Sequence, residues 1–179
     1  MSLAKAPLFQ ALPHLRALAM AMILAAFVPC GAGAAEDTPS GQPVPRFVSL
    51  KADKVNVRNG PNRDQDVAWV FARAGLPVEV TAEFETWRRI RDADGAEGWV
   101  YHSMLSGRRT ALVAPWQKET VVLRDAPNGD ARTVAKLEPG VLGAVKACDG
   151  KWCRLTGEGF DGYVDQSKLF GVYPSEKLD

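Results

Sequence analysis

Few side chains in this 179-residue chain have types and spacings suited to catalysis. A nucleophile needs an adjacent base. His102 stands beside Ser103, but neighbouring residues of a strand point to opposite faces, so this imidazole is poorly placed to activate the hydroxyl. Asp92 and Asp94 flank a turn at Gly95, where solvated carboxylates are ordinary. The sequence therefore predicts a protein that is not an enzyme.

Two cysteines near the C-terminus have the spacing of a closed hairpin. Cys148 and Cys153 flank the turn-like run Asp-Gly-Lys-Trp at 149–152. A disulfide between them would stabilise the fold by about 2 kcal/mol through loop entropy. A redox pair usually has two intervening residues, and a metal site would need further ligands that the chain lacks. We expect a structural disulfide, no metal and no cofactor.

Tryptophans beside arginines are the candidates for ligand binding. Strand alternation places Trp87 with Arg89 and Arg91 on one outward face, and Trp152 with Arg154 on another. Such a face could bind an extended, partly anionic ligand through ring contacts and guanidinium–carboxylate pairs. In the alternative interpretation, the tryptophans cover the open end of a small core and the arginine stems pack over them. Both interpretations stay open, and these five residues form the predicted ligand-binding site.

The N-terminus has the pattern of a secretory signal peptide over residues 1–34. A positively charged start without acidic residues precedes 12 apolar residues at 17–28, and small residues lead to cleavage after Ala34. The apolar run is shorter than the roughly 18–20 residues that cross a bilayer. Lipidation of Cys30 is the other alternative. We expect a periplasmic or secreted protein with no membrane span in its mature form.

Short β-strands dominate the remainder of the chain. Residues 35–45 are rich in proline and predict a flexible linker. Beyond them, alternating apolar residues recur between turn signals, which predicts an all-β fold of the small-barrel or sandwich type. The formal net charge of +1, from 22 Lys and Arg against 21 Asp and Glu, argues against a nucleic-acid partner.

The chain repeats itself at intervals of 64 to 66 residues. The run at 55–62 returns at 121–128, Trp87 returns as Trp152, and Gly-Trp-Val at 98–100 returns as Gly-Tyr-Val at 162–164. The repeat predicts a first domain over residues 46–108, a second over 109–174 and a tail at 175–179.

These motifs resemble the bacterial SH3 domain. The pattern lies in Val-Asn-Val-Arg-Asn-Gly-Pro at 55–61, followed by Gly75, Trp87 and Gly-Trp-Val at 98–100. A narrower resemblance is to an exported tandem-SH3 family of alphaproteobacteria; it rests on Trp69 and the runs 75–80, 87–91, 105–110, 152–154 and 170–174. It implies two SH3-like, partly open barrels of five to six strands and an envelope location. The second copy departs from the pattern, because Ala126 replaces the glycine before the proline.

The function predicted from these features is a non-catalytic binding module of the cell envelope. Its partner would be cell-wall peptidoglycan or an envelope protein. Residues 46–109 carry 11 Lys and Arg against 9 Asp and Glu, whereas residues 110–179 carry 9 against 10, so an anionic ligand should prefer the first copy. The alternatives are a structural interaction protein and an accessory subunit that positions a cell-wall hydrolase.

Overall fold

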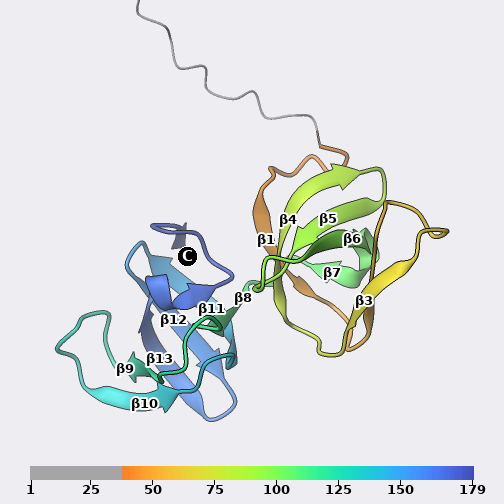
Figure 1. Cartoon of the computed structure of the whole chain (residues 1–179). Helices are drawn as coiled ribbons and strands as arrows, with labels where there is room; N and C mark the ends of the chain where they lie inside the picture. The colour runs from red at the N-terminus through yellow and green to blue at the C-terminus, as the bar shows by residue number, and fades with distance from the viewer. Residues whose placement is uncertain (1–37) are drawn as a thin grey trace, which may run out of the picture. The chain divides into compact units, whose positions relative to one another are not determined.

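Alternation of buried with exposed or half-buried side chains runs through several strands, among them residues 55–58, 97–101 and 121–124, as the sequence predicts for sheets with one face on a core. The computed structural model describes residues 38–179, and these residues form two antiparallel sheets with no α-helix among them (Figure 1). The all-β, tandem SH3-like fold is therefore confirmed. The predicted signal peptide, residues 1–34, and the first residues of the predicted linker lie outside the described residues.

The first sheet forms a curled barrel from seven strands in the order β3-β2-β6-β5-β4-β1-β7. The strands are β1 (Arg46–Leu50), β2 (Val55–Arg58), β3 (Val67–Phe71), β4 (Pro77–Phe84), β5 (Trp87–Arg91), β6 (Glu97–Tyr101) and β7 (Leu105–Ser106). A 3-10 turn, η1 (His102–Met104), joins β6 to β7. Fully buried aliphatic side chains, among them Val57, Ile90 and Val100, fill the interior.

The second sheet repeats this order as β10-β9-β13-β12-β11-β8-β14, and a further strand, β15, pairs with β11. The strands are β8 (Thr110–Val113), β9 (Val121–Arg124), β10 (Thr133–Leu137), β11 (Leu142–Asp149), β12 (Trp152–Gly157), β13 (Phe160–Asp165), β14 (Leu169–Phe170) and β15 (Lys177–Leu178). The 3-10 turn η2 (Gln166–Lys168) precedes β14. The core contains Leu123, Leu155 and Val164, each fully buried.

Each barrel has more strands than the five to six that the resemblance implies, because two-residue strands close its ends. Among them, β15 lies in the predicted tail at 175–179 and pairs with β11 through Cys148 and Leu178. At the other end of the described chain, Ser40 of the predicted linker donates hydrogen bonds to the Glu83 carboxylate from its backbone N and its Oγ, at 2.9 and 2.7 Å. Both terminal segments are thus attached to the adjoining barrel.

The repeat is visible in the turns as well as in the strands. Gly75 and Gly140 each have φ +79°, a left-handed conformation that glycine adopts without steric cost. Their amides donate to equivalent carbonyl oxygens, Gly75 to Leu50 at 2.8 Å and Gly140 to Val113 at 2.7 Å. The two turns therefore lead into β4 and β11 with the same backbone geometry.

Side chains of the two sheets also contact each other. The Phe47 ring lies 5.3 Å from the Phe170 ring and 4.7 Å from the Tyr173 ring, measured between centroids. The Tyr173 hydroxyl donates to Glu79 at 2.9 Å, and Thr110 Oγ1 donates to the Gly75 carbonyl at 2.7 Å.

Candidate functional site

Trp87, the first residue of β5, lines a cleft in the first barrel. It is only 7% exposed, and its ring packs edge-on against Tyr101 at 5.5 Å between centroids. The two residues face each other because β5 and β6 pair Trp87 with Tyr101. We call the hollow beside them cleft A; its volume is about 350 Å³. It is lined by Lys54, Asn56, Arg58, Arg63, Trp87, Tyr101 and Met104.

The charges that line cleft A are all positive. The Arg63 guanidinium lies 5.7 Å from the centroid of the Tyr101 ring. Arg58, at the end of β2, donates from Nη1 to the Gln65 carbonyl at 2.6 Å. Among the residues that the structure describes, none of Lys54, Arg58 and Arg63 forms an ion pair with a carboxylate. Cleft A therefore combines aromatic surface with cations suited to an anionic group.

Arg89 and Arg91, predicted to share the Trp87 face, lie outside cleft A. Both are exposed and each pairs with a carboxylate of a neighbouring strand. Arg89 Nη2 lies 2.5 Å from Glu97 Oε2. Arg91 donates to Glu79 Oε2 from Nε at 3.0 Å and from Nη2 at 2.5 Å, and these hydrogen bonds raise its pKa. Much of their charge is therefore balanced by neighbours.

In the second barrel, the predicted site residues Trp152 and Arg154 are also separated. Arg154 is exposed and donates to Asp161 at 2.9 and 2.7 Å; these bonds raise the pKa of the guanidinium and lower that of the carboxyl. Trp152 is half-buried, and its cross-strand partner is Asp165, where the first barrel has Tyr101. The structure thus does not bring Trp152 and Arg154 into one cleft.

Trp152 instead lines three hollows on the second barrel, two of which we call cleft B and cleft C. The first, cleft B, has a volume of about 620 Å³ and occupies the position of cleft A, since Val122 and Arg124 replace Asn56 and Arg58. Glu119 and Asp165 also line cleft B, so its charge is mixed.

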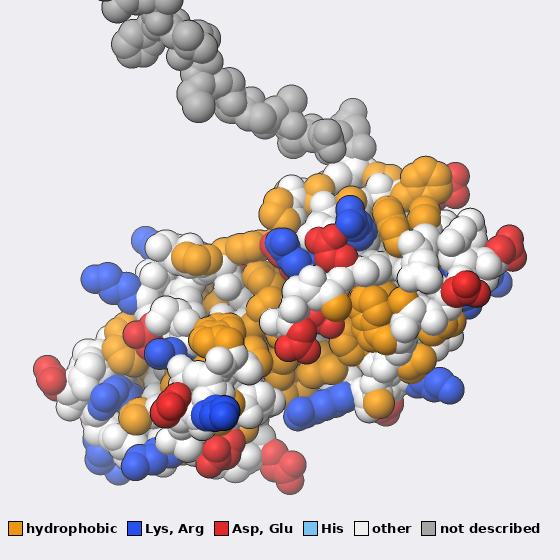
Figure 2. Space-filling model, in the orientation of Figure 1, with side chains coloured by type: hydrophobic (Ala, Val, Ile, Leu, Met, Phe, Trp, Pro, Cys, Tyr) orange, Lys and Arg blue, Asp and Glu red, His pale blue; other side chains and the backbone are white. Residues whose placement is uncertain are grey.

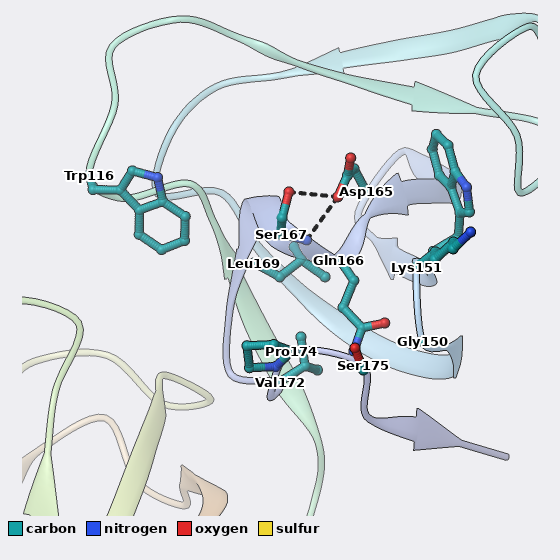
Figure 3. Close-up of a pocket in the computed structure, with 11 residues that line it drawn as sticks. Trp116, Gly150, Lys151, Asp165, Gln166, Ser167, Leu169, Val172, Pro174 and Ser175 are labelled. Carbon is teal, nitrogen blue, oxygen red and sulfur yellow. Dashed lines mark hydrogen bonds between the residues drawn. The ribbon is translucent and has the colours of Figure 1, made fainter. Parts of the chain in front are cut away.

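The second of these hollows, cleft C, has a volume of about 600 Å³ (Figure 3). It is lined by Trp116, Gly150, Lys151, Trp152, Asp165, Gln166, Ser167, Leu169, Val172, Pro174 and Ser175.

Sequence reasoning missed the residues that complete these clefts. Trp116 is 58% exposed and belongs to the loop between β8 and β9, which has no aromatic counterpart in the first copy. A lone tryptophan in a polar loop is a signal that could have identified it. Tyr101 and Arg63 carried a weaker signal, because their proximity to Trp87 depends on strand pairing and on the course of the β2–β3 loop.

The two cysteines form the predicted disulfide. Cys148 and Cys153 are opposite each other on β11 and β12, with 4.1 Å between their Cα atoms. The bond closes the hairpin at one wall of cleft C, where Gly150 and Lys151 lie. Over residues 38–179, no group of three or more His, Cys, Asp or Glu side chains is arranged to hold a metal ion.

Charges of both signs are interspersed on the molecular face shown in Figure 2, with apolar side chains between them. No patch of a single sign dominates this face, which agrees with the nearly balanced composition of the chain.

Comparison with known proteins gives a repeated match. The sequence pattern of the bacterial SH3 domain matches residues 51–107 and again residues 117–171. Comparison with curated proteins gives no match. Among solved structures, the chain is similar to NlpC2 and NlpC1 of Trichomonas vaginalis, with 14% identity to each and TM-scores of 0.33 and 0.32. The similarity covers 70% of this chain but 48% and 45% of those chains, so this chain spans about half of their length.

Proposed function

The chain belongs to the bacterial SH3 domain family, and from this premise we propose that it is a non-catalytic binding module of the cell envelope. Its ligand in this proposal is cell-wall peptidoglycan or an acidic peptide segment, bound in cleft A of the first barrel. The observation that carries the proposal is the lining of cleft A by aromatic rings and by three cations, Lys54, Arg58 and Arg63, without a carboxylate.

The chemistry of cleft A favours a ligand with a carboxylate on an apolar or ring-shaped body. Arg63 and Arg58 offer guanidinium donors, which form shorter and stronger hydrogen bonds to carboxylates than neutral donors do. The edge of Trp87 and the ring of Tyr101 supply apolar contact area next to them. Because Trp87 is already packed against Tyr101, the aromatic wall is formed before a ligand binds, which lowers the entropy cost of binding.

A location outside the cytoplasm is part of the same proposal. The Cys148–Cys153 disulfide is compatible with an oxidising compartment such as the periplasm. Within residues 38–179, no helix has the length and hydropathy of a membrane span. In this proposal the protein is periplasmic or secreted, needs no cofactor and performs no reaction.

Co-sedimentation with purified peptidoglycan sacculi, at low and at near-physiological salt, tests the proposal. We expect the protein to pellet with the sacculi at both salt concentrations, because the aromatic contacts are not screened by ions. Arg63→Ala should weaken binding by about tenfold, since it removes hydrogen bonds to a charged group. Arg63 is exposed and unpaired among the described residues, so this variant should fold normally, which circular dichroism would check.

Arg89→Ala is the matched control. Arg89 is also an exposed arginine of the first barrel, but it pairs with Glu97 and lies outside cleft A. If Arg89→Ala weakens binding and Arg63→Ala does not, the site is the Trp87, Arg89 and Arg91 face predicted from the sequence. Absence of binding at either salt would reject peptidoglycan as the ligand. The alternatives are then a structural interaction protein or a subunit that positions a cell-wall hydrolase, and crosslinking in the envelope would identify the partner.

A further inference from the structure

Cleft C of the second barrel differs in character from cleft A. Its wall contains Trp116, Leu169, Val172 and Pro174, which form an apolar surface, together with the carboxylate of Asp165 and the carboxamide of Gln166. Figure 3 shows Trp116 on one side of the η2 turn and Lys151 on the other, with Asp165 and Gln166 between them. Asp165 is the one acidic residue in the lining of cleft C.

Gln166 is a buried side chain that fixes one wall of cleft C. The residue is 4% exposed, and its Nε2 donates to the carbonyl oxygens of Tyr173 at 2.7 Å and Glu176 at 3.0 Å. These two bonds fix the orientation of the amide. Its Oε1 is buried and has no hydrogen-bond partner among the described residues. This oxygen has almost no exposed surface, so an occupant of cleft C does not reach it. The part that Gln166 plays is to hold residues 173–176, with Pro174 and Ser175, in the wall of the cleft.

Asp165 adds a negative charge to the wall of cleft C. Its Oδ1 accepts hydrogen bonds from Ser167 N at 2.9 Å and Ser167 Oγ at 2.7 Å, which hold the carboxylate at the start of η2. Within residues 38–179, Oδ2 has no hydrogen bond or ion pair. In the first barrel, the equivalent position is Tyr101, which packs on Trp87. Replacing the tyrosine by an aspartate leaves Trp152 more exposed and places a free carboxylate oxygen next to it.

We propose that cleft C binds a primary ammonium group on an aliphatic chain, such as a lysine-type side chain presented by a peptide. The aliphatic stem would pack on Trp116, Val172 and Pro174. The ammonium would donate to Asp165 Oδ2, next to Trp152. An ammonium has three donors and no acceptor, which suits an unpaired carboxylate oxygen, and tryptophan faces attract cations. This site is separate from cleft A and from the ligand proposed for it.

Lys151 distinguishes a cationic occupant of cleft C from an anionic one. It is exposed and contributes the cation in the wall of cleft C. Its charge opposes an ammonium occupant and would attract an anionic one. Removing that charge must therefore change the affinity in opposite directions for the two kinds of occupant.

Titration of the full-length protein with N-acetyl-lysine-N-methylamide, followed by tryptophan fluorescence and calorimetry, tests the proposal. We expect saturable binding in the millimolar range. The norleucine analogue, which lacks the charge, and the Nε-acetylated analogue, which lacks the ammonium, should each bind at least about tenfold more weakly. Equal affinity for the norleucine analogue, or the absence of saturable binding, would overturn the proposal.

Three variants locate the site. Asp165→Asn keeps an oxygen for the Ser167 bonds but removes the charge, and it should weaken binding about tenfold. Trp116→Ala removes an exposed ring, so the fold should be unaffected, and it should weaken binding about fivefold. Lys151→Ala should strengthen binding about twofold. Glu138→Gln, at an exposed glutamate of the same barrel that lies outside cleft C, should leave the affinity unchanged. Unchanged binding by Asp165→Asn and Trp116→Ala, or weaker binding by Lys151→Ala, would contradict the assignment to cleft C.

Discussion

Gly162 shows at the residue scale why a strand can need the smallest side chain. It lies in β13 next to β9, and a Cβ at this position would stand 2.6 Å from the Arg124 carbonyl oxygen and 2.9 Å from Leu123 Cγ. The nearest obstacle is backbone, which cannot rotate away. Gly162, the counterpart of Gly98 in the repeat, therefore marks a close approach of two strands.

Gly162→Ala should lower the free energy of unfolding by about 1–3 kcal/mol, because β9 and β13 would have to separate to make room. Gly129→Ala is the control, since nothing lies within 4 Å of its Cβ position and its φ is outside the left-handed region. Urea unfolding of both variants would measure the difference. Equal stabilities would mean that the strands adjust without cost.

The predicted site residues show what alternation can and cannot predict. The pattern of apolar residues correctly places Ile90 and Leu155 inside and Arg89, Arg91 and Arg154 outside. Alternation says nothing, however, about the residues on the neighbouring strands. Strand pairing places Glu79 opposite Arg91, so a carboxylate balances the charge of this arginine. The sequence of one strand does not show which residues of the neighbouring strand lie opposite it. Whether the five predicted residues bind a ligand stays a prediction.

At the scale of elements, Glu83 of β4 holds the segment before β1 against the barrel. Its side chain is 1% exposed; Oε1 lies 2.5 Å from Arg46 Nη2 and 3.0 Å from Arg88 Nε, and the carboxylate also accepts from Ser40. Burial raises the pKa of Glu83, but the hydrogen bonds from Ser40 and Arg46 and the charge of Arg88 outweigh it and hold the pKa below its ordinary value of 4.5. The charged form is therefore the one that the fold favours.

Attachment of this segment should depend on pH. Because the folded-state pKa is lowered, the stabilisation is complete above pH 4.5 and is lost as the pH falls through the lower folded-state value. The amide resonance of Ser40 should move toward its random-coil position over this acid range. Glu83→Gln should show the detached position at neutral pH, whereas Glu138→Gln, an exposed glutamate of the second barrel, should not. A Ser40 resonance that is unaffected by Glu83→Gln would contradict this role.

At the scale of the whole molecule, composition and repeats predicted the architecture better than they predicted the clefts. The matched blocks of the two copies correspond to strands and turns in the same order, so fold class and domain number could be predicted from them. Clefts A and B lie at equivalent positions, but their linings differ. Asp165 replaces Tyr101 and Trp116 has no aromatic counterpart, so these two parts of the cleft C wall are particular to the second barrel. An internal repeat predicts what is shared and gives no signal for such differences.

Tyr173 joins the two barrels and supplies the remaining prediction. Its hydroxyl donates to Glu79 Oε1 at 2.9 Å, and its ring lies against Phe47. Burial raises the pKa of Tyr173, and the hydrogen bond to the negatively charged Glu79 raises it further above the ordinary value of 10. Glu79 also accepts from Arg91, so this predicted site residue is linked through Glu79 to the contact between the barrels.

Tyr173→Phe should keep the ring contacts and lose the hydrogen bond, which lowers the free energy of unfolding at neutral pH by about 1 kcal/mol. Because the folded-state pKa is raised, the neutral phenol stabilises the fold below pH 10, and this stabilisation is lost as the pH rises through the higher folded-state value. Wild-type stability should therefore fall more steeply above pH 10 than that of Tyr173→Phe. In an absorbance titration of the three tyrosines, the variant should lack the step at highest pH.

Tyr163→Phe is the control, because its hydroxyl has no hydrogen-bond partner among residues 38–179. If both variants behave alike, the Tyr173–Glu79 bond does not hold the barrels together in solution.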